Sequence, residues 1–89
     1  MWVVPYLAEF MGTFALLLSI FATGNFAVIG ATLALIIYLI GGVSGAHVNP
    51  AVSLAMYVKG SLSATELAGY MVAQLLGGVA GLYTYKALA

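Results

Sequence analysis

The residues Asn49, Pro50 and Ala51 form the most informative polar motif of the chain. Asparagine is strongly preferred just before a helix, and proline at the first helical position costs no hydrogen bond. We therefore expect a helix to start at Pro50. A helix start carries several free N–H donors and roughly half a positive elementary charge. Together with the Asn49 amide, it can orient a passing dipole, donate a hydrogen bond to a water or hydroxyl oxygen, and repel cations.

The helix that begins at Pro50 is too short to cross a membrane. Helix-forming residues continue to Val58 and end at Lys59-Gly60. From Pro50 to Val58 the helix extends about 13 Å at ~1.5 Å per residue, less than half of the ~30 Å hydrocarbon core of a bilayer. We interpret this piece as a half-helix that begins near the middle of the membrane, with Lys59 at the membrane surface.

The stretch before the half-helix, from Gly41 to Asn49, is rich in glycine, and we expect it not to be helical. Irregular backbone at membrane depth is tolerated only where protein covers it or where it lines a water-filled cavity. The stretch should therefore line a polar path. Backbone carbonyl groups would form a row of hydrogen-bond acceptors along this path, and they belong to Gly45, Ala46, His47 and Val48.

Polar side chains in the apolar stretches must have a partner or a role. A carboxylate in a membrane span costs ~2.5–3.5 kcal/mol or more on insertion scales, and Glu9 lies in such a stretch. We interpret Glu9 as a buried acceptor for loop N–H groups, with a proton carrier as the alternative. Gln74 is interpreted as a link between helix and loop, and His47 as a hydrogen-bonded loop residue. One histidine without cysteine cannot form a usual zinc site, so we expect no metal and no cofactor.

The composition excludes most classes of soluble protein. Of 89 residues, 65% are hydrophobic and 4% are charged, whereas a soluble domain normally carries about a quarter charged residues. Zero net charge, with Lys and Arg totalling 2, excludes nucleic-acid binding through phosphate neutralisation. We therefore expect an integral, multi-pass membrane protein whose surroundings are the lipid bilayer, and we assign it to the plasma (inner) membrane.

The apolar stretches define the expected fold, an all-α membrane protein with three transmembrane helices and one re-entrant half-helix. We expect residues 1–89 to form a single repeat of this kind. The spans are predicted at about 3–23, 26–42 and 66–86, with the re-entrant loop and half-helix at about 43–58.

Two short motifs refine the third span. The residues from Ser63 to Glu66 have the Ser-x-x-Glu form of a capping box, in which each side chain binds a free N–H group of the first turn. Further along, Gly77-x-x-x-Gly81 is a motif of close helix packing in membranes. These motifs predict a capped helix that packs tightly against another span.

Three longer motifs follow one another along the chain. They are Ala8-Glu9-Phe10-x-Gly12-Thr13-Phe14, then Ser44-Gly45-Ala46-His47-x-Asn49-Pro50-Ala51-Val52, then Tyr70-x-x-Ala73-Gln74-x-x-Gly77-Gly78. Together they resemble the major intrinsic proteins, the aquaporins and glycerol facilitators. The resemblance implies a passive channel for water, glycerol or other small neutral solutes. It places along the pore Gly45, Ala46, His47, Val48, Asn49, Pro50 and Ala51, and it implies that Glu9, Ser44 and Gln74 hold the loop.

The chain also departs from the pattern of this family. Ile29 lies twenty positions before Asn49 and matches the second-span position of the family's outer constriction. Many water-selective members have an aromatic residue there, so Ile29 implies a less restrictive mouth. The family builds its pore from two inverted repeats, and this chain matches the first repeat only. The constriction arginine belongs after the second Asn-Pro-Ala motif, and Val52 stands in the corresponding place here.

The pore therefore needs a second repeat, for which two interpretations are open. The chain is a fragment or separately encoded half that pairs with a C-terminal half, or two copies insert in opposite orientations and pair. With the family's topology, Lys59 and Lys86 lie on opposite sides of the membrane, so positive charge fixes no orientation. The resemblance further implies four pores side by side.

Two other classes of function compete with a channel. One is a small exporter of dual topology that uses Glu9 as its proton site. The other is a non-conducting membrane assembly subunit, which would leave the segment at Asn49 and Pro50 without a purpose. We expect no enzyme activity, because Gly42-Val43-Ser44-Gly45-Ala46 only approaches the hydrolase pattern and no triad accompanies it.

Overall fold

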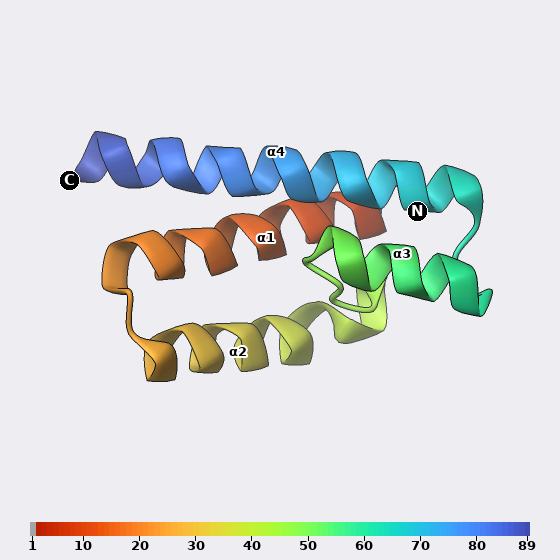
Figure 1. Cartoon of the computed structure of the whole chain (residues 1–89), viewed down its shortest axis with the longest axis horizontal. Coiled ribbons are helices and arrows are strands. Elements are labelled where there is room, and N and C mark those ends of the chain that lie inside the picture. The colour runs from red at the N-terminus through yellow and green to blue at the C-terminus, as the bar shows by residue number, and fades with distance from the viewer. Residues whose placement is uncertain (1) are drawn as a thin grey trace.

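The computed structural model describes residues 2–89, which form four helices. Three helices run side by side along the 39 Å long axis, with α1 between α2 and α4, and α3 accompanies only the half of the bundle where α4 begins (Figure 1). Of the predicted repeat, only Met1 lies outside the described residues. The helices are α1 (Val4–Thr23), α2 (Phe26–Ser44), α3 (Pro50–Lys59) and α4 (Ala64–Leu88).

The three long helices each have the length and hydropathy to cross a membrane. Helix α2 is the least covered by the rest of the chain, and on it Phe26 is 89% exposed and Tyr38 is 83% exposed. Apolar surface of this extent is typical of a membrane-embedded face, where it contacts lipid. The chain is therefore an integral membrane protein, and the predicted all-α fold class is confirmed. Helix α3 has 10 residues, or about 15 Å, which is too short to span.

Helix α1 packs most extensively against α4, and glycines on α4 make the approach close. A Cβ atom at Gly77 would collide with the carbonyl oxygen of Phe10. A Cβ atom at Gly81 would lie 3.0 Å from the carbonyl oxygen of Phe14. The absence of side chains on Gly77 and Gly81 thus lets the two backbones touch, as the close-packing motif predicts.

The helix boundaries have clear local causes. Helices α1, α2 and α3 end at Gly24, Gly45 and Gly60, whose φ angles of 56°, 91° and 96° lie in the left-handed region that glycine adopts without steric cost. At the start of α4, the Ser63 hydroxyl accepts a hydrogen bond from the Glu66 N–H, and the Glu66 carboxylate accepts one from the Ser63 N–H. The predicted capping box is therefore confirmed.

The expectation that the whole stretch from Gly41 to Asn49 is non-helical is wrong for its first part. Helix α2 continues through Ser44, two residues beyond the predicted end of the span at 42, and the Gly45 N–H closes the last turn on the Gly41 carbonyl at 3.0 Å. A glycine costs a helix only about 1 kcal/mol, whereas an unpaired N–H group in a membrane costs several. The helix therefore ends only at Gly45, which adopts a left-handed conformation, and the Ser44 hydroxyl accepts a hydrogen bond from the next N–H group, that of Ala46.

Candidate functional site

The loop that joins α2 to α3 has an unusual backbone. Ala46 and Val48 have φ angles of 51° and 46°, in the left-handed region that residues with a side chain seldom adopt. For a β-branched residue such as Val48 this conformation is a genuine outlier, and each such residue costs on the order of 1–3 kcal/mol. The surrounding structure must therefore hold the loop in this form.

The Glu9 carboxylate on α1 holds the loop. Its Oε2 atom accepts hydrogen bonds from the Ser44 hydroxyl at 2.6 Å and from the His47 N–H at 3.0 Å. Its Oε1 atom accepts from the Val48 N–H at 2.7 Å and from the Gln74 amide at 2.9 Å. Glu9 is fully buried, and its donors come from α2, the loop and α4. These bonds offset the cost of placing a carboxylate in the membrane and fix two consecutive N–H groups of the loop.

Four N–H groups of the loop, those of residues 45–48, are hydrogen-bonded within the protein. Besides the two bonds to Glu9, the Gly45 N–H binds the Gly41 carbonyl, and the Ala46 N–H binds the Ser44 hydroxyl at 3.2 Å. The carbonyl groups of the same four residues behave differently. Within residues 2–89, no donor binds the carbonyl oxygens of Gly45, Ala46, His47 and Val48. The loop therefore keeps a row of free acceptors.

Two further residues hold the loop, and we did not assign them to the site from the sequence. The Ser53 hydroxyl is fully buried and lies 2.8 Å from His47 Nδ1, and it accepts a hydrogen bond from the Gln74 amide at 2.8 Å. The Tyr70 hydroxyl donates to the Ser44 carbonyl at 2.7 Å. Spacing gave a signal for both, because Ser53 lies one turn after Asn49 and Tyr70 one turn before Gln74.

The half-helix begins as the sequence predicts. Asn49 has extended backbone, with φ −161°, and its Oδ1 atom accepts a hydrogen bond from the Ala51 N–H at 2.8 Å. Pro50 is the first helical residue. Asn49 and Ala51 are exposed, and within the described chain the Asn49 Nδ2 atom donates to no acceptor. The amide hydrogens of Asn49 are therefore free to bind a molecule outside the chain.

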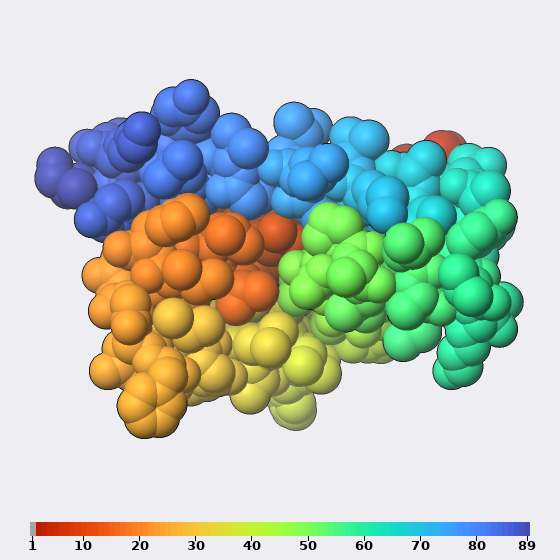
Figure 2. Space-filling model, in the orientation of Figure 1, coloured from red at the N-terminus to blue at the C-terminus, as the bar shows by residue number. Residues whose placement is uncertain are grey.

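A groove runs onward from the start of α3 and has a volume of about 560 Å³. We call it the α3 groove; its walls are α1 from Thr13 to Phe21 and α4 from Gln74 to Leu82, and it is closed at one end by residues 48–50. Figure 2 shows this face, where green α3 covers one half and the orange and red surface of α1 lies uncovered in the other. Its polar lining residues are Thr13, Asn49 and Gln74, and buried oxygen atoms of Thr13 and Gln74 have no hydrogen-bond partner within residues 2–89.

The structure does not bring every predicted residue to this groove. Ile29 is half-buried on α2 and does not line it, and neither does Glu9. Ala46 is buried, and His47 is half-buried with its ring 5.0 Å from the ring of Tyr70. The groove thus gathers Val48, Asn49, Pro50 and Gln74, while the other predicted residues hold the loop from behind or lie elsewhere.

Fold and site together define an α-helical membrane protein with a re-entrant half-helix. Residues 3–89 match the family model described as Major intrinsic protein. The chain therefore belongs to the major intrinsic protein family, whose members are membrane channels rather than enzymes. The resemblance that the three sequence motifs indicated is confirmed.

Individual relatives match over most of this chain. The chain is 40% identical over 83 residues to Glycerol uptake facilitator protein-like 6 of Lactiplantibacillus plantarum. It is 41% identical over 88 residues to Aquaporin Z of Brucella melitensis, and 39% over 93 residues to human Aquaporin-9. These alignments cover 83%, 82% and 88% of this chain but only 38%, 39% and 32% of the relatives. The chain thus spans about two fifths or less of the length of these curated relatives.

Proposed function

We propose that the chain is one half of a passive channel for water, glycerol or other small neutral solutes. The observation that carries this proposal is that the loop's N–H groups are hydrogen-bonded within the protein whereas its carbonyl groups are not. The N–H groups of residues 45–48 bind protein, while the carbonyl oxygens of the same residues accept no hydrogen bond, and the side-chain amide of the following Asn49 donates none. The names of the relatives, a glycerol uptake facilitator and two aquaporins, support the same class of solute.

In this proposal each part of the site has a separate role. The free carbonyls of the loop accept hydrogen bonds from the permeating molecule, and the Asn49 amide donates one to its oxygen. The start of α3 adds the positive end of a helix dipole, which disfavours cations without binding a neutral solute tightly. Weak contacts of this kind allow a solute to enter and also to leave.

A second repeat completes the pore by packing along the α3 groove. The groove supports this role because it continues from the first turn of α3 into the half of the bundle that α3 leaves uncovered (Figure 2). The second repeat is either another copy of the chain or a separate C-terminal half, and four such pores assemble side by side. Ile29 belongs to the outer mouth, and Val52 leaves this half without a constriction arginine. The complex lies in the plasma (inner) membrane.

Osmotic shrinkage of liposomes that contain the purified chain tests the proposal. Asn49→Leu should bring water flux down to that of empty vesicles, because leucine cannot donate a hydrogen bond. Asn25→Leu is the matched control, since Asn25 caps α2 in the same way but lies far from the loop. Equal flux in the wild type and Asn49→Leu, above that of empty vesicles, would contradict the assigned role of Asn49. Absence of flux from the folded wild-type chain alone would contradict pairing between two copies and leave the separate half as partner.

A further inference from the structure

Val48 is held by its side chain as well as by its backbone. The side chain is only 4% exposed and lies in a small core between α1 and α2. Ile36 and Ala46 are buried in the same core, and Leu16 and Ile40 pack around it. Val48 therefore directs its N–H toward Glu9, its carbonyl away from the protein's donors, and its side chain between two membrane spans.

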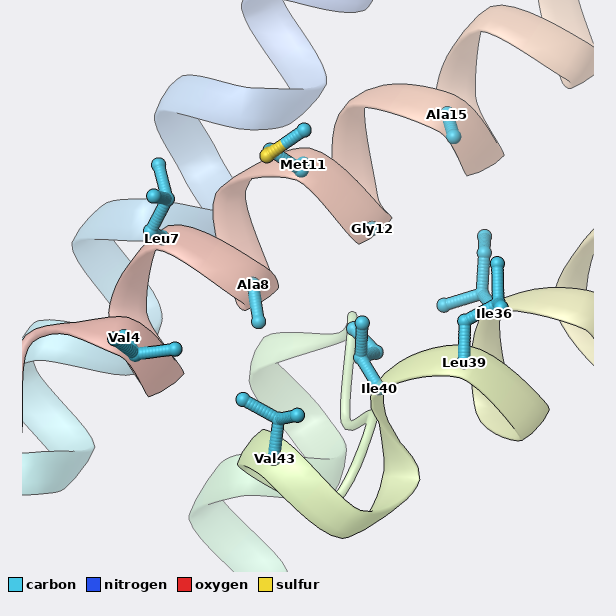
Figure 3. Close-up of a pocket in the computed structure, with 10 residues that line it drawn as sticks. All are labelled: Val4, Leu7, Ala8, Met11, Gly12, Ala15, Ile36, Leu39, Ile40 and Val43. Carbon is cyan, nitrogen blue, oxygen red and sulfur yellow. The ribbon is translucent and has the colours of Figure 1, made fainter. Parts of the chain in front are cut away.

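The space for Val48 exists because residue 12 of α1 is glycine. A Cβ atom at Gly12 would lie 2.8 Å from Val48 Cγ1 and 2.9 Å from Ile40 Cδ1, closer than real Cβ contacts occur. Ile40 Cδ1 is the end of a flexible side chain and can move aside. Val48 Cγ1 sits on a stiff, β-branched side chain next to a strained backbone, so it can move only with the loop. Figure 3 shows Gly12 on α1 facing Ile36 and Ile40 of α2 across an apolar groove.

We propose that Val48 anchors the loop and that Gly12 is the gap that receives the anchor, so that the two positioning residues set where the loop carbonyls lie. Gly12 follows Glu9 by three residues on the same helix, which places both on one face. Helix α1 thus holds Val48 at two points, the N–H through Glu9 and the side chain through the gap at Gly12. The consequence for permeation rests on the proposed function, whereas the anchoring itself does not.

Amide hydrogen exchange of the purified chain in lipid nanodiscs tests the anchor without any measurement of flux. Gly12→Ala should accelerate exchange of the His47 and Val48 amides by at least about tenfold, because overpacking pushes Val48 and the loop away from Glu9. Gly30→Ala is the matched control, since Gly30 is also helical and a Cβ there meets nothing within 4 Å. In both variants the amides of α2 near Asn25 should be unchanged.

A compensating variant makes the test specific to the contact between Gly12 and Val48. Val48→Ala removes the colliding methyl group, so Gly12→Ala/Val48→Ala should exchange more slowly at His47 than Gly12→Ala alone. Val48→Ala alone, which adds no volume and should fold, is expected to accelerate exchange several-fold by loosening the anchor. The proposal is overturned if the His47 and Val48 amides exchange at the same rate in Gly12→Ala as in Gly30→Ala. It is also overturned if the His47 amide exchanges faster in the double variant than in Gly12→Ala, or if Val48→Ala leaves the exchange rate unchanged.

The same variants in liposomes connect the anchor to permeation and separate the two proposals. Gly12→Ala should change the ratio of glycerol to water permeability, and the double variant should bring the ratio back toward that of Val48→Ala. The expected exchange pattern with no conduction by any variant would support the anchor and count against a self-completing channel. Conduction with a permeability ratio unaffected by Gly12→Ala would overturn the role of the anchor in permeation.

Discussion

The starts of α2 and α3 use the same residue in the same way, yet only the start of α3 lines the α3 groove. Asn25 and Asn49 both have extended backbone, and each accepts a hydrogen bond from the N–H group two residues later. Around Asn25 the cap bonds are exposed and local, and the preceding residue is the turn glycine Gly24. Before Asn49 lies a loop that bonds to Glu9 of α1, and the same carboxylate accepts a hydrogen bond from Gln74 of α4.

The comparison shows that a helix cap is a local property, whereas the groove at a helix start depends on the rest of the fold. Any asparagine before a helix can cap it. What distinguishes Asn49 is that Glu9 and Gln74, from helices distant in sequence, place it at the end of a groove. Substitutions that act on these distant residues should therefore affect the start of α3 and spare the start of α2.

The largest effect is expected from Glu9→Leu. Four donors lose their acceptor inside the protein, and each buried unsatisfied donor costs about 1–3 kcal/mol, so the free energy of unfolding should fall by at least about 3 kcal/mol. Titration with SDS in detergent micelles measures this change. The exposed Glu66 provides the control, because Glu66→Leu should cost only about 1 kcal/mol. Amide hydrogen exchange of Glu9→Leu separates the two helix starts, because only the Val48 amide should exchange faster. If the Ala27 and Val28 amides accelerated as much as the Val48 amide, the two helix starts would not differ in their dependence on Glu9.

A smaller effect is expected from Tyr70→Phe. The variant removes one buried hydrogen bond, from the Tyr70 hydroxyl to the Ser44 carbonyl, and should lower the free energy of unfolding by about 1 kcal/mol. Tyr38→Phe serves as the control, since Tyr38 is 83% exposed and its hydroxyl makes no hydrogen bond among the described residues. Equal losses in the two variants would show that the Tyr70 hydroxyl does not support the loop.

The smallest change in stability is expected when the capping residues Asn25 and Asn49 are each replaced by serine. These two variants also compare the two helix starts most directly, because the same substitution is made at both. Serine caps a helix about as well as asparagine, so Asn25→Ser and Asn49→Ser should each alter the free energy of unfolding by less than about 0.5 kcal/mol. Only Asn49→Ser should reduce water flux, by roughly two- to tenfold, because the two amide donors are replaced by a single hydroxyl donor on a shorter side chain. A similar reduction in both variants would mean that flux reports on helix capping rather than on the Asn49 amide.

Much of the fold was predictable from the sequence because its causes are local. Hydropathy locates the long helices, Asn49 and Pro50 mark the start of α3, and Ser63 and Glu66 mark the start of α4. The continuation of α2 through Ser44 was not predictable from helix propensity. In a membrane the cost of unpaired backbone groups exceeds the cost of glycine, so a glycine-rich segment stays helical longer than it would in water.

The site was predictable in part. A carboxylate in a membrane span demands donors, which makes Glu9 stand out, but nothing in the sequence says that two of its donors are consecutive loop N–H groups. The left-handed conformations of Ala46 and Val48 were also hidden, because residues with side chains seldom adopt them and only tertiary contacts make them stable. The position of Ser53 one turn after Asn49 was only a weak signal, because a serine on a short helix is common and its role depends on its burial between His47 and Gln74.

The hydrogen bonds of Glu9 also constrain the order of assembly during membrane insertion. Glu9 is on α1, and Gln74, one of its donors, is 65 residues further along on α4. Until α4 has been inserted, the carboxylate lacks that donor and the Ser53 hydroxyl lacks its bond from the same amide. The hydrogen bonds around the loop are therefore complete only once α4 has packed against α1, and a chain interrupted before α4 leaves Glu9 with three of its four donors.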